Sequence, residues 1–276
     1  MSTIVSKAEE FATKKLASNS NPNYLYHNLR HTQRVVESIE ELIEGEDINE
    51  KDSELLLVAA WFHDLGYTLA YNDHEERSCD LAKEFLTAQN CSTDFINSVC
   101  KLIMATVKEY IPKNILEKII RDADSSHFAV KNFMATSELL REELASLGLQ
   151  NISSAEWREE NIHLLRSKHR FYTDYAIDNW QKGKDKNIKR LIKAKKKDKK
   201  LVKKESLKAE FKGGLPDRGI QTLYRVTLRN HMKLSDIADT KANILLSVNA
   251  IIISMALANL IPKLDNPSND YLLNFA

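Results

Sequence analysis

The sequence predicts an all-α protein: a helical bundle, then a basic helical linker and a C-terminal membrane-spanning helix. Glycine and proline, which disfavour helix interiors, number only 7 and 5 among the 276 residues. Apolar residues recur three and four positions apart over long stretches, as they do in amphipathic helices. Alternating patterns of the strand type have no useful length, so a sheet is not expected.

The bundle is expected to run from about residue 2 to residue 180 as a succession of helices. Residues 31–45 place apolar side chains on one face and end at Gly45. Residues 49–66 begin with acidic residues and close at Gly66. Further helices are predicted in segments 74–90, 92–107, 111–130, 134–148 and 153–180, the last of them long and rich in aromatic residues.

The linker is expected to cover residues 182–219. From Lys182 to Lys208 the chain holds 14 basic and 3 acidic residues, whereas residues 1–60 hold 6 basic and 11 acidic ones. Such a segment is either a solvated helix or a disordered link. Residues 182–208 contain no aromatic residue, which argues against a nucleic-acid partner and favours contact with anionic lipid headgroups or a merely solvated helix. Glycine and proline cluster in residues 212–219, the clearest break in the chain.

The C-terminal region, residues 220–276, contains the predicted span. Residues 244–261 are 18 positions without a charge, bracketed by Lys241 and Lys263. As a helix this stretch extends about 27 Å, close to the thickness of a bilayer's hydrocarbon layer. A buried helix in a soluble oligomer is the alternative interpretation.

The stretch "AAWFHDLGY" places His63 and Asp64 side by side at the end of an apolar run. Adjacent helical residues point about 100° apart, so the two side chains do not face each other, but both can reach one point beyond the helix end. A metal ion at that point would offset the cost of burying a carboxylate. The alternative is an aspartate that caps a neighbouring helix, with the histidine as its hydrogen-bond partner.

Two further stretches carry polar residues in helical patterns. "YLYHNLRHTQRVV" uses three- and four-residue spacings, so His27 and His31 are expected to share a helix face. "IIRDADSSHFA" puts Asp122 and Asp124 in an apolar helix. Along the chain, a histidine is followed by His-Asp about 30 residues later and by an aspartate about 60 residues after that.

This order resembles that of the HD-domain phosphohydrolases, specifically a small predicted metal-dependent branch whose first motif is similar to "YHN..H...V" and whose last is similar to "DADL". The resemblance covers roughly residues 20–180. It implies that the metal ligands are His31, His63, Asp64 and Asp124. Asp122 competes with Asp124, but residues two apart lie on nearly opposite helix faces, so only one of them faces the ion. We assign Asp124, which matches the family's final aspartate.

Two imidazoles and two carboxylates favour a divalent manganese, iron, cobalt, nickel or zinc ion and do not choose among them. A water molecule on the ion would become a hydroxide and attack phosphorus. Some members of the family carry a further histidine that completes a two-metal centre. Lys108 and Glu109 occupy that region here, which favours a single ion.

Beside Asp64, the candidate catalytic residues are His27 and Glu75. His27 and Asn28 match the first motif and are expected either to orient His31 and touch phosphate or only to cap the helix. His74 and Glu75 open "HEERS", which resembles the family's next helix start. They are expected to support the site or to bind substrate, and the alternative is ordinary first-turn electrostatics.

The C-terminal stretch "HMKLSDIADTKANILLSVNAIIISMAL" resembles the transmembrane module of Pycsar antiphage effectors over roughly residues 224–260. That module normally has two spans, and "NDYLLNFA" at the end of the chain is similar to the start of a second one, so a truncated chain is expected. The resemblance implies self-association into a homo-oligomer and damage to the inner membrane after a nucleotide signal. The lysine-rich block before the span implies that the bundle lies in the cytoplasm.

The sequence therefore predicts an HD phosphohydrolase-like domain at residues 1–181, the linker at 182–219 and a Pycsar-effector-like region at 220–276. One hypothesis is a membrane-anchored, metal-dependent phosphohydrolase or phosphodiesterase that acts on a nucleotide or cyclic nucleotide within antiphage defence. In the alternative, the HD domain senses a nucleotide without turnover and the spans disrupt the membrane. Intact metal ligands favour the first hypothesis, and the C-terminal resemblance favours the second.

Overall fold

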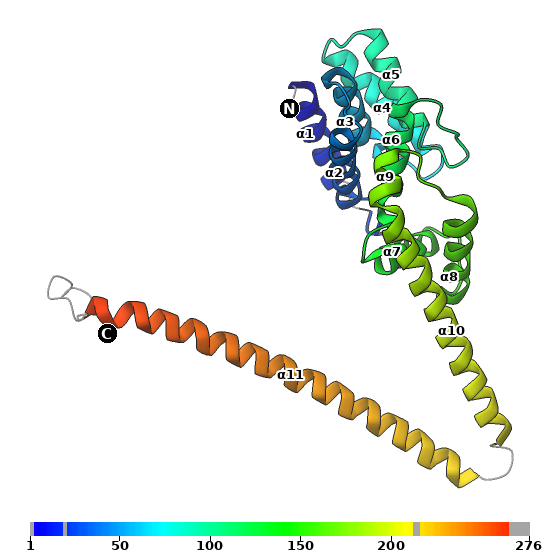
Figure 1. Ribbon diagram of the computed structural model, residues 1–276, viewed down its shortest axis with the longest axis vertical. Helices are drawn as coiled ribbons and strands as arrows, with labels where there is room; N and C mark the ends of the chain where they lie inside the picture. The colour runs from blue at the N-terminus through cyan, green and yellow to red at the C-terminus, as the bar shows by residue number, and fades with distance from the viewer. Residues whose placement is uncertain (1–2, 19–20, 212–215, 265–276) are drawn as a thin grey trace. The chain divides into compact units, whose positions relative to one another are not determined.

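A computed structural model describes residues 3–18, 21–211 and 216–264 (Figure 1). Every element in these described residues is helical, which confirms the predicted all-α class. The chain divides into two compact units, residues 1–200 and 201–276.

Short helices joined by short loops build the first unit (Figure 1). The α-helices are α1 (Thr3–Ser18), α2 (Leu29–Gly45), α3 (Glu50–Phe62), α4 (His74–Ala88), α5 (Thr93–Met104), α6 (Ile115–Asp124), α7 (Phe133–Ser146), α8 (Ser154–His163), α9 (Asp174–Asn179) and α10 (Gln181–Phe211), which continues into the second unit. Two 3₁₀ turns, η1 (Leu65–Thr68) and η2 (Ser125–Phe128), and one π-helical turn, η3 (Leu164–Lys168), lie between them.

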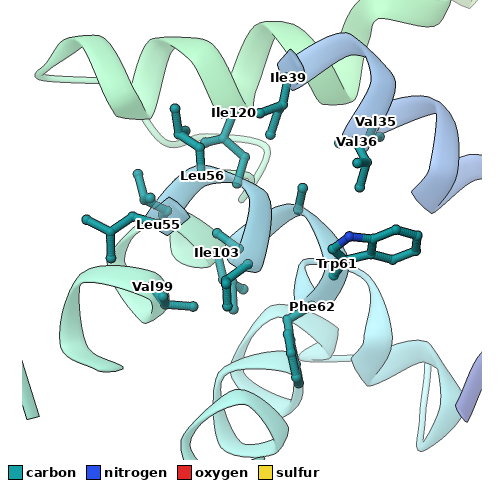
Figure 2. Close-up of a cluster of buried hydrophobic side chains, with 14 of the residues drawn as sticks. Val35, Val36, Ile39, Leu55, Leu56, Trp61, Phe62, Val99, Ile103 and Ile120 are labelled. Atoms are coloured by element: carbon teal, nitrogen blue, oxygen red, sulfur yellow. The ribbon is translucent and has the colours of Figure 1, made fainter. Parts of the chain in front are cut away.

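The α3 helix is the centre of the core. It contacts α1, α2, α5 and α6, and its residues from Val58 to Phe62 are all buried. A helix that is apolar on every side is stable only inside a protein, because each buried large aliphatic or aromatic side chain contributes about 1.5–3 kcal/mol. Figure 2 shows side chains of α2, α5 and α6, among them Ile39, Ile103 and Ile120, gathered around Leu56 of α3.

Capping residues fix where most of these helices begin. Side-chain oxygens of six residues accept the first free backbone N–H groups of α2, α3, α5, α6, α8 and α9: Asn28, Asn49, Ser92, Asn114, Ser153 and Thr173. Ser153 and Glu156 form a reciprocal capping box at the start of α8. Local sequence therefore accounts for the helix starts.

The single long helix predicted over residues 153–180 is wrong. The structure divides it into α8, η3 and α9, with an extended residue, His169, after η3 (φ −87°, ψ 134°). The Asp122 carboxylate accepts the backbone N–H groups of Tyr172 and Thr173, so these groups are not available to a continuing helix. A long-range contact overrides the local helical pattern here.

The lysine-rich segment is helical, and its first part is docked. Residues 182–200, expected to begin a solvated linker, lie in the first unit as part of α10. Asn187 donates to the carbonyl oxygens of Phe128 and Val130 at 2.9 and 2.7 Å, and Leu191 is buried in a small apolar cluster. A Cβ at Gly183 would lie 2.3 Å from the Ala129 carbonyl oxygen, so only glycine allows this approach.

The second unit contains one described helix beyond α10, α11 (Pro216–Leu264). The expected break at 212–219 is only partly described: residues 216–219 belong to α11, and 212–215 lie outside the described residues. Within α11, Thr222–Met255 contains an 18-residue stretch that is apolar enough to cross a membrane, with a mean hydropathy of 1.3, and none of that stretch is buried. The expected second span at 269–276 also lies outside the described residues.

Candidate metal centre

The end of α3 delivers His63 and Asp64 to one place. Phe62 ends the helix, His63 keeps helical backbone angles, and Asp64 (φ −107°, ψ 7°) turns the chain into η1. A Cβ at Gly66 would lie 2.0 Å from the His74 carbonyl oxygen, so glycine at this position lets η1 approach the start of α4. The turn thus brings a second helix terminus beside the His-Asp pair.

Four predicted side chains converge at this point, and we call them the candidate metal centre: His31, His63, Asp64 and Asp124. The two Nε2 atoms of His31 and His63 lie 3.3 Å apart. Asp64 Oδ2 lies 3.0 Å from the first Nε2 and 3.3 Å from the second. Asp124 Oδ1 lies 3.4 and 3.9 Å from the same two atoms. The ligand atoms of His31, His63 and Asp124 all lie within 4.8 Å of one another, a spacing that can hold a metal ion.

The centre is buried on the α3 side and open at Asp124. His63, His31 and Asp64 are 0%, 2% and 8% exposed, whereas the Asp124 side chain is 33% exposed. A substrate would therefore approach from the α6 side.

The donor set fits a divalent ion. Asp64 Oδ2 is buried and, although close to both imidazoles, accepts no hydrogen bond of acceptable geometry. A buried carboxylate oxygen without a partner is costly, and a cation removes that cost. His63 Nδ1 lies 2.7 Å from the Ala60 carbonyl oxygen and donates to it, so its Nε2 is turned toward the centre as a ligand nitrogen.

Without an ion, the histidines balance the carboxylates. Burial acts to lower the pKa of His63, but Asp64 and then Asp124 outweigh it and raise the pKa to about 9. Burial acts to raise the pKa of Asp124, but the His31 hydrogen bond and the His63 charge outweigh it and lower the pKa to about 2. A bound metal ion would take the place of the imidazolium charge.

Arg34 fixes the tautomer of a neutral His31. Its Nη2 lies 2.7 Å from His31 Nδ1. A guanidinium only donates, so Nδ1 is the acceptor and the proton of a neutral His31 lies on Nε2, facing the carboxylates. For a neutral His31 to bind an ion through Nε2, its proton would have to move to Nδ1 and Arg34 would have to turn away, whereas His63 would lose only its Nε2 proton.

Asp122 lies outside the centre, although the sequence left it in competition with Asp124. Its fully buried carboxylate accepts from the backbone N–H groups of Tyr172 and Thr173 at 2.8–3.0 Å and from the Thr173 hydroxyl at 2.8 Å. The two aspartates therefore have different roles. Asp124 faces the histidines of the candidate metal centre, and Asp122 binds the backbone at the start of α9.

His27 is close to the centre but does not share the helix face of His31 as expected. Asn28, with extended backbone angles, caps α2, so His27 precedes the helix. Its Nδ1 pairs with Oε1 of Glu143, a fully buried residue of α7 whose other oxygen accepts from the backbone N–H groups of Tyr26 and His27. The ring centroids of His27 and His31 are still only 5.8 Å apart.

Glu75 reaches the centre only through His74. Its Oε2 lies 3.2 Å from His74 Nδ1, and His74 Nε2 lies 3.8 Å from Asp64 Oδ1. The Tyr67 ring is stacked between the imidazoles of His74 and His27, with centroid distances of 4.0 and 4.2 Å. The three rings form a continuous wall beside the four converging side chains.

Sequence analysis missed three residues of this site: Arg34, Tyr67 and Glu143. Arg34 carries a weak signal, because it lies one helical turn after His31. Tyr67 follows the His-Asp turn, where an aromatic residue also suits a core. Glu143 carries no signal, since a glutamate in an amphipathic helix is normally exposed and its partner is 116 positions away.

Residues 28–129 are similar to the HD domain family, and this range includes the whole candidate metal centre. Proteins with this domain are generally metal-dependent hydrolases. A crystal structure of a protein from Lactobacillus plantarum is 20% identical, aligns with 70% of this chain and 97% of its own, and has a TM-score of 0.48. No curated protein matches the chain at a significant level.

Replacing Asp122 with alanine should destabilise the fold and leave metal binding intact. Burial raises the pKa of Asp122 to about 6, so at pH 8 the carboxylate is ionised and its loss strands the N–H groups of Tyr172 and Thr173. We expect a loss of about 2–4 kcal/mol in urea unfolding followed by tryptophan fluorescence. Asp124→Ala should instead lose the bound metal, with little change in the free energy of unfolding. If the folded Asp122→Ala variant lost its metal, the assignment of a purely structural role to Asp122 would be wrong.

Metal affinity should rise with pH. The folded pKa of His63, about 9, lies above the ordinary value of 6.5. The ion pairs of protonated His63 therefore stabilise the metal-free protein fully below about pH 6.5, and this stabilisation is lost as the pH rises through 9. An incoming metal ion competes with the proton on His63. Calorimetric titration with Mn²⁺ should show affinity increasing by up to about tenfold per pH unit in this window, with proton release. An affinity that stays constant from pH 6.5 to 9 would argue against His63 as a ligand.

Proposed function

We propose that the protein is a membrane-anchored, metal-dependent phosphohydrolase that acts on a nucleotide, as a phosphate ester or a cyclic phosphodiester. The observation that supports this most is the convergence of two imidazoles and two carboxylates from α2, the end of α3 and α6 on one point, within an HD domain. An unsatisfied buried carboxylate oxygen at that point calls for a cation.

In this proposal, His31, His63, Asp64 and Asp124 hold one divalent ion. An ion bound there would supply an acidified water as the nucleophile for hydrolysis of the ester P–O bond. The leaving oxygen needs a proton, and His27 is the candidate donor, because Glu143 fixes its Nδ1 and leaves Nε2 for substrate. Glu75 acts indirectly, by orienting His74 beside Asp64.

We further propose that α11 anchors the chain in the inner membrane. Large apolar residues of Thr222–Met255 are exposed around the helix, including Ile244, Leu246 and Ile252. The lysine-rich α10 precedes this segment, and basic residues flank spans on the cytoplasmic side, which supports a cytoplasmic HD domain. Exposed lysines also attract anionic lipid headgroups.

The same exposed segment favours the second candidate function. Here the HD domain binds a nucleotide without turnover, and α11 associates with copies of itself and disrupts the membrane as part of antiphage defence. Asn249 supports self-association, because an amide in mid-span is costly toward lipid and is better satisfied against another helix.

A turnover assay separates the two functions. The full chain in detergent, loaded with Mn²⁺, should hydrolyse at least one member of a panel of linear and cyclic nucleotides. The His63→Ala/Asp64→Ala variant should lose its bound metal and fall to the background rate, and the matched control His163→Ala, on the exposed face of α8, should retain both. Saturable binding without turnover by the wild type would favour the sensor, and full metal content in the double variant would remove the ligand assignment.

Membrane anchoring predicts that the protein stays in membranes washed with alkaline carbonate. Ile252→Asp places a charge in mid-span at a cost of roughly 2.5–3.5 kcal/mol and should release a large part of the protein. Val202→Asp is the matched control, because Val202 is equally exposed on a helix but lies outside the span. Release of the wild-type protein into the supernatant would instead support the alternative interpretation, in which α11 is a buried helix in a soluble oligomer.

A further inference from the structure

A cavity of about 450 Å³ borders the candidate metal centre and shares Asp124 with it. This volume is in the range of small-molecule sites, about 300–1,000 Å³. Four cationic side chains line it, Lys108, Arg121, Lys168 and Arg170, against Glu109 and Asp124. Since Asp124 faces the centre, the remaining wall is strongly positive.

The wall has two parts from distant parts of the sequence. Lys108 and Arg121 lie within the HD domain, whereas Lys168 and Arg170 lie beyond it, in residues 168–172, which we call the cationic segment. The segment begins at the last residue of the π-helical turn η3, a type of turn often found at functional sites.

Three contacts fix the cationic segment beside Asp124. Asp122 accepts the Tyr172 N–H at 3.0 Å. His169 Nε2 lies 2.9 Å from the Ser125 hydroxyl, and Lys184 Nζ donates to the His169 carbonyl oxygen at 2.7 Å. These contacts hold the backbone that carries Lys168 and Arg170 in place before any ligand arrives, which reduces the entropy cost of binding.

Several donors around this cavity are not used within the described part of the chain. Arg121 is engaged, because its guanidinium donates to carbonyl oxygens at the end of α5, including that of Thr106 at 2.7 Å. The ammonium groups of Lys108 and Lys168 have no ion pair or hydrogen bond in the described part of the chain. Unpaired donors around a positive cavity match a ligand with many anionic oxygens.

We propose that this cavity binds a second phosphate group of the substrate, so that the substrate is a polyphosphorylated nucleotide rather than a cyclic mononucleotide. This rests on the proposed function, since the reacting phosphorus would lie at the candidate metal centre. The further phosphate would lie against Lys108, Lys168 and Arg170. The cationic segment then determines specificity, and it belongs to this chain's extension beyond the HD domain.

The first test uses metal-free full-length protein and inorganic tripolyphosphate, so that chelation of a metal plays no part. Calorimetry should show saturable binding to the wild type, weakened at least about tenfold in Lys168→Gln/Arg170→Gln. The matched control Lys51→Gln/Lys101→Gln removes two charges from exposed sites outside the cavity and should bind as the wild type does. Equal weakening in both variants, or no binding by the wild type, would overturn the proposal.

The second test uses the Mn²⁺-loaded protein. Lys168→Gln/Arg170→Gln should raise KM for nucleoside triphosphates at least about tenfold and leave hydrolysis of the singly charged ester bis(p-nitrophenyl) phosphate unchanged. If that ester is hydrolysed but KM for triphosphates does not move, the inference fails and the proposed function stands. If tripolyphosphate binds through these residues but nothing is hydrolysed, the anion site stands and the proposed function fails.

Discussion

The burial of Asp64 directly after the apolar C-terminal part of α3 is the constraint on which the site depends. A carboxylate placed there is tolerated only if positive charge surrounds it, and the two imidazoles at 3.0 and 3.3 Å supply that charge when no ion is bound. The neighbouring helices serve this requirement: α2 carries His31, α6 carries Asp124, and the glycine turn after α3 brings α4 close. The helices that pack in the core are therefore the same ones that position the side chains of the site.

The pair of aspartates at the end of α6 joins the site to the rest of the first unit. Because they are two residues apart, one faces the histidines while the other is directed into the protein, where it interrupts a helix and holds the start of the next one. The interruption leaves residues 169–172, directly after η3, as irregular backbone near Asp124, and irregular segments on a rigid scaffold commonly carry binding residues.

Much of the fold and the centre could be predicted because the signals are local. Apolar spacing gave the helices, capping residues account for their starts, and the His-Asp pair stood out as polar residues at the end of an apolar run. The features that could not be predicted depend on contacts distant in sequence. Asp122 breaks a helix about 50 positions away, Glu143 pairs with a histidine 116 positions away, and the docking of α10 depends on a backbone approach at Gly183.

The contact between Lys184 and His169 has a thermodynamic consequence. Lys184 belongs to the part of α10 that lies in the first unit, up to Lys200, whereas the rest of α10 lies in the second unit, and His169 lines the cavity wall. A ligand that favours one position of His169 favours the docked state of this helix by the same free energy. By reciprocity, whatever holds the lysine-rich helix elsewhere, such as a charged lipid surface, alters ligand affinity by an equal amount. The helix would thus connect ligand binding in this cavity energetically with the remainder of the chain.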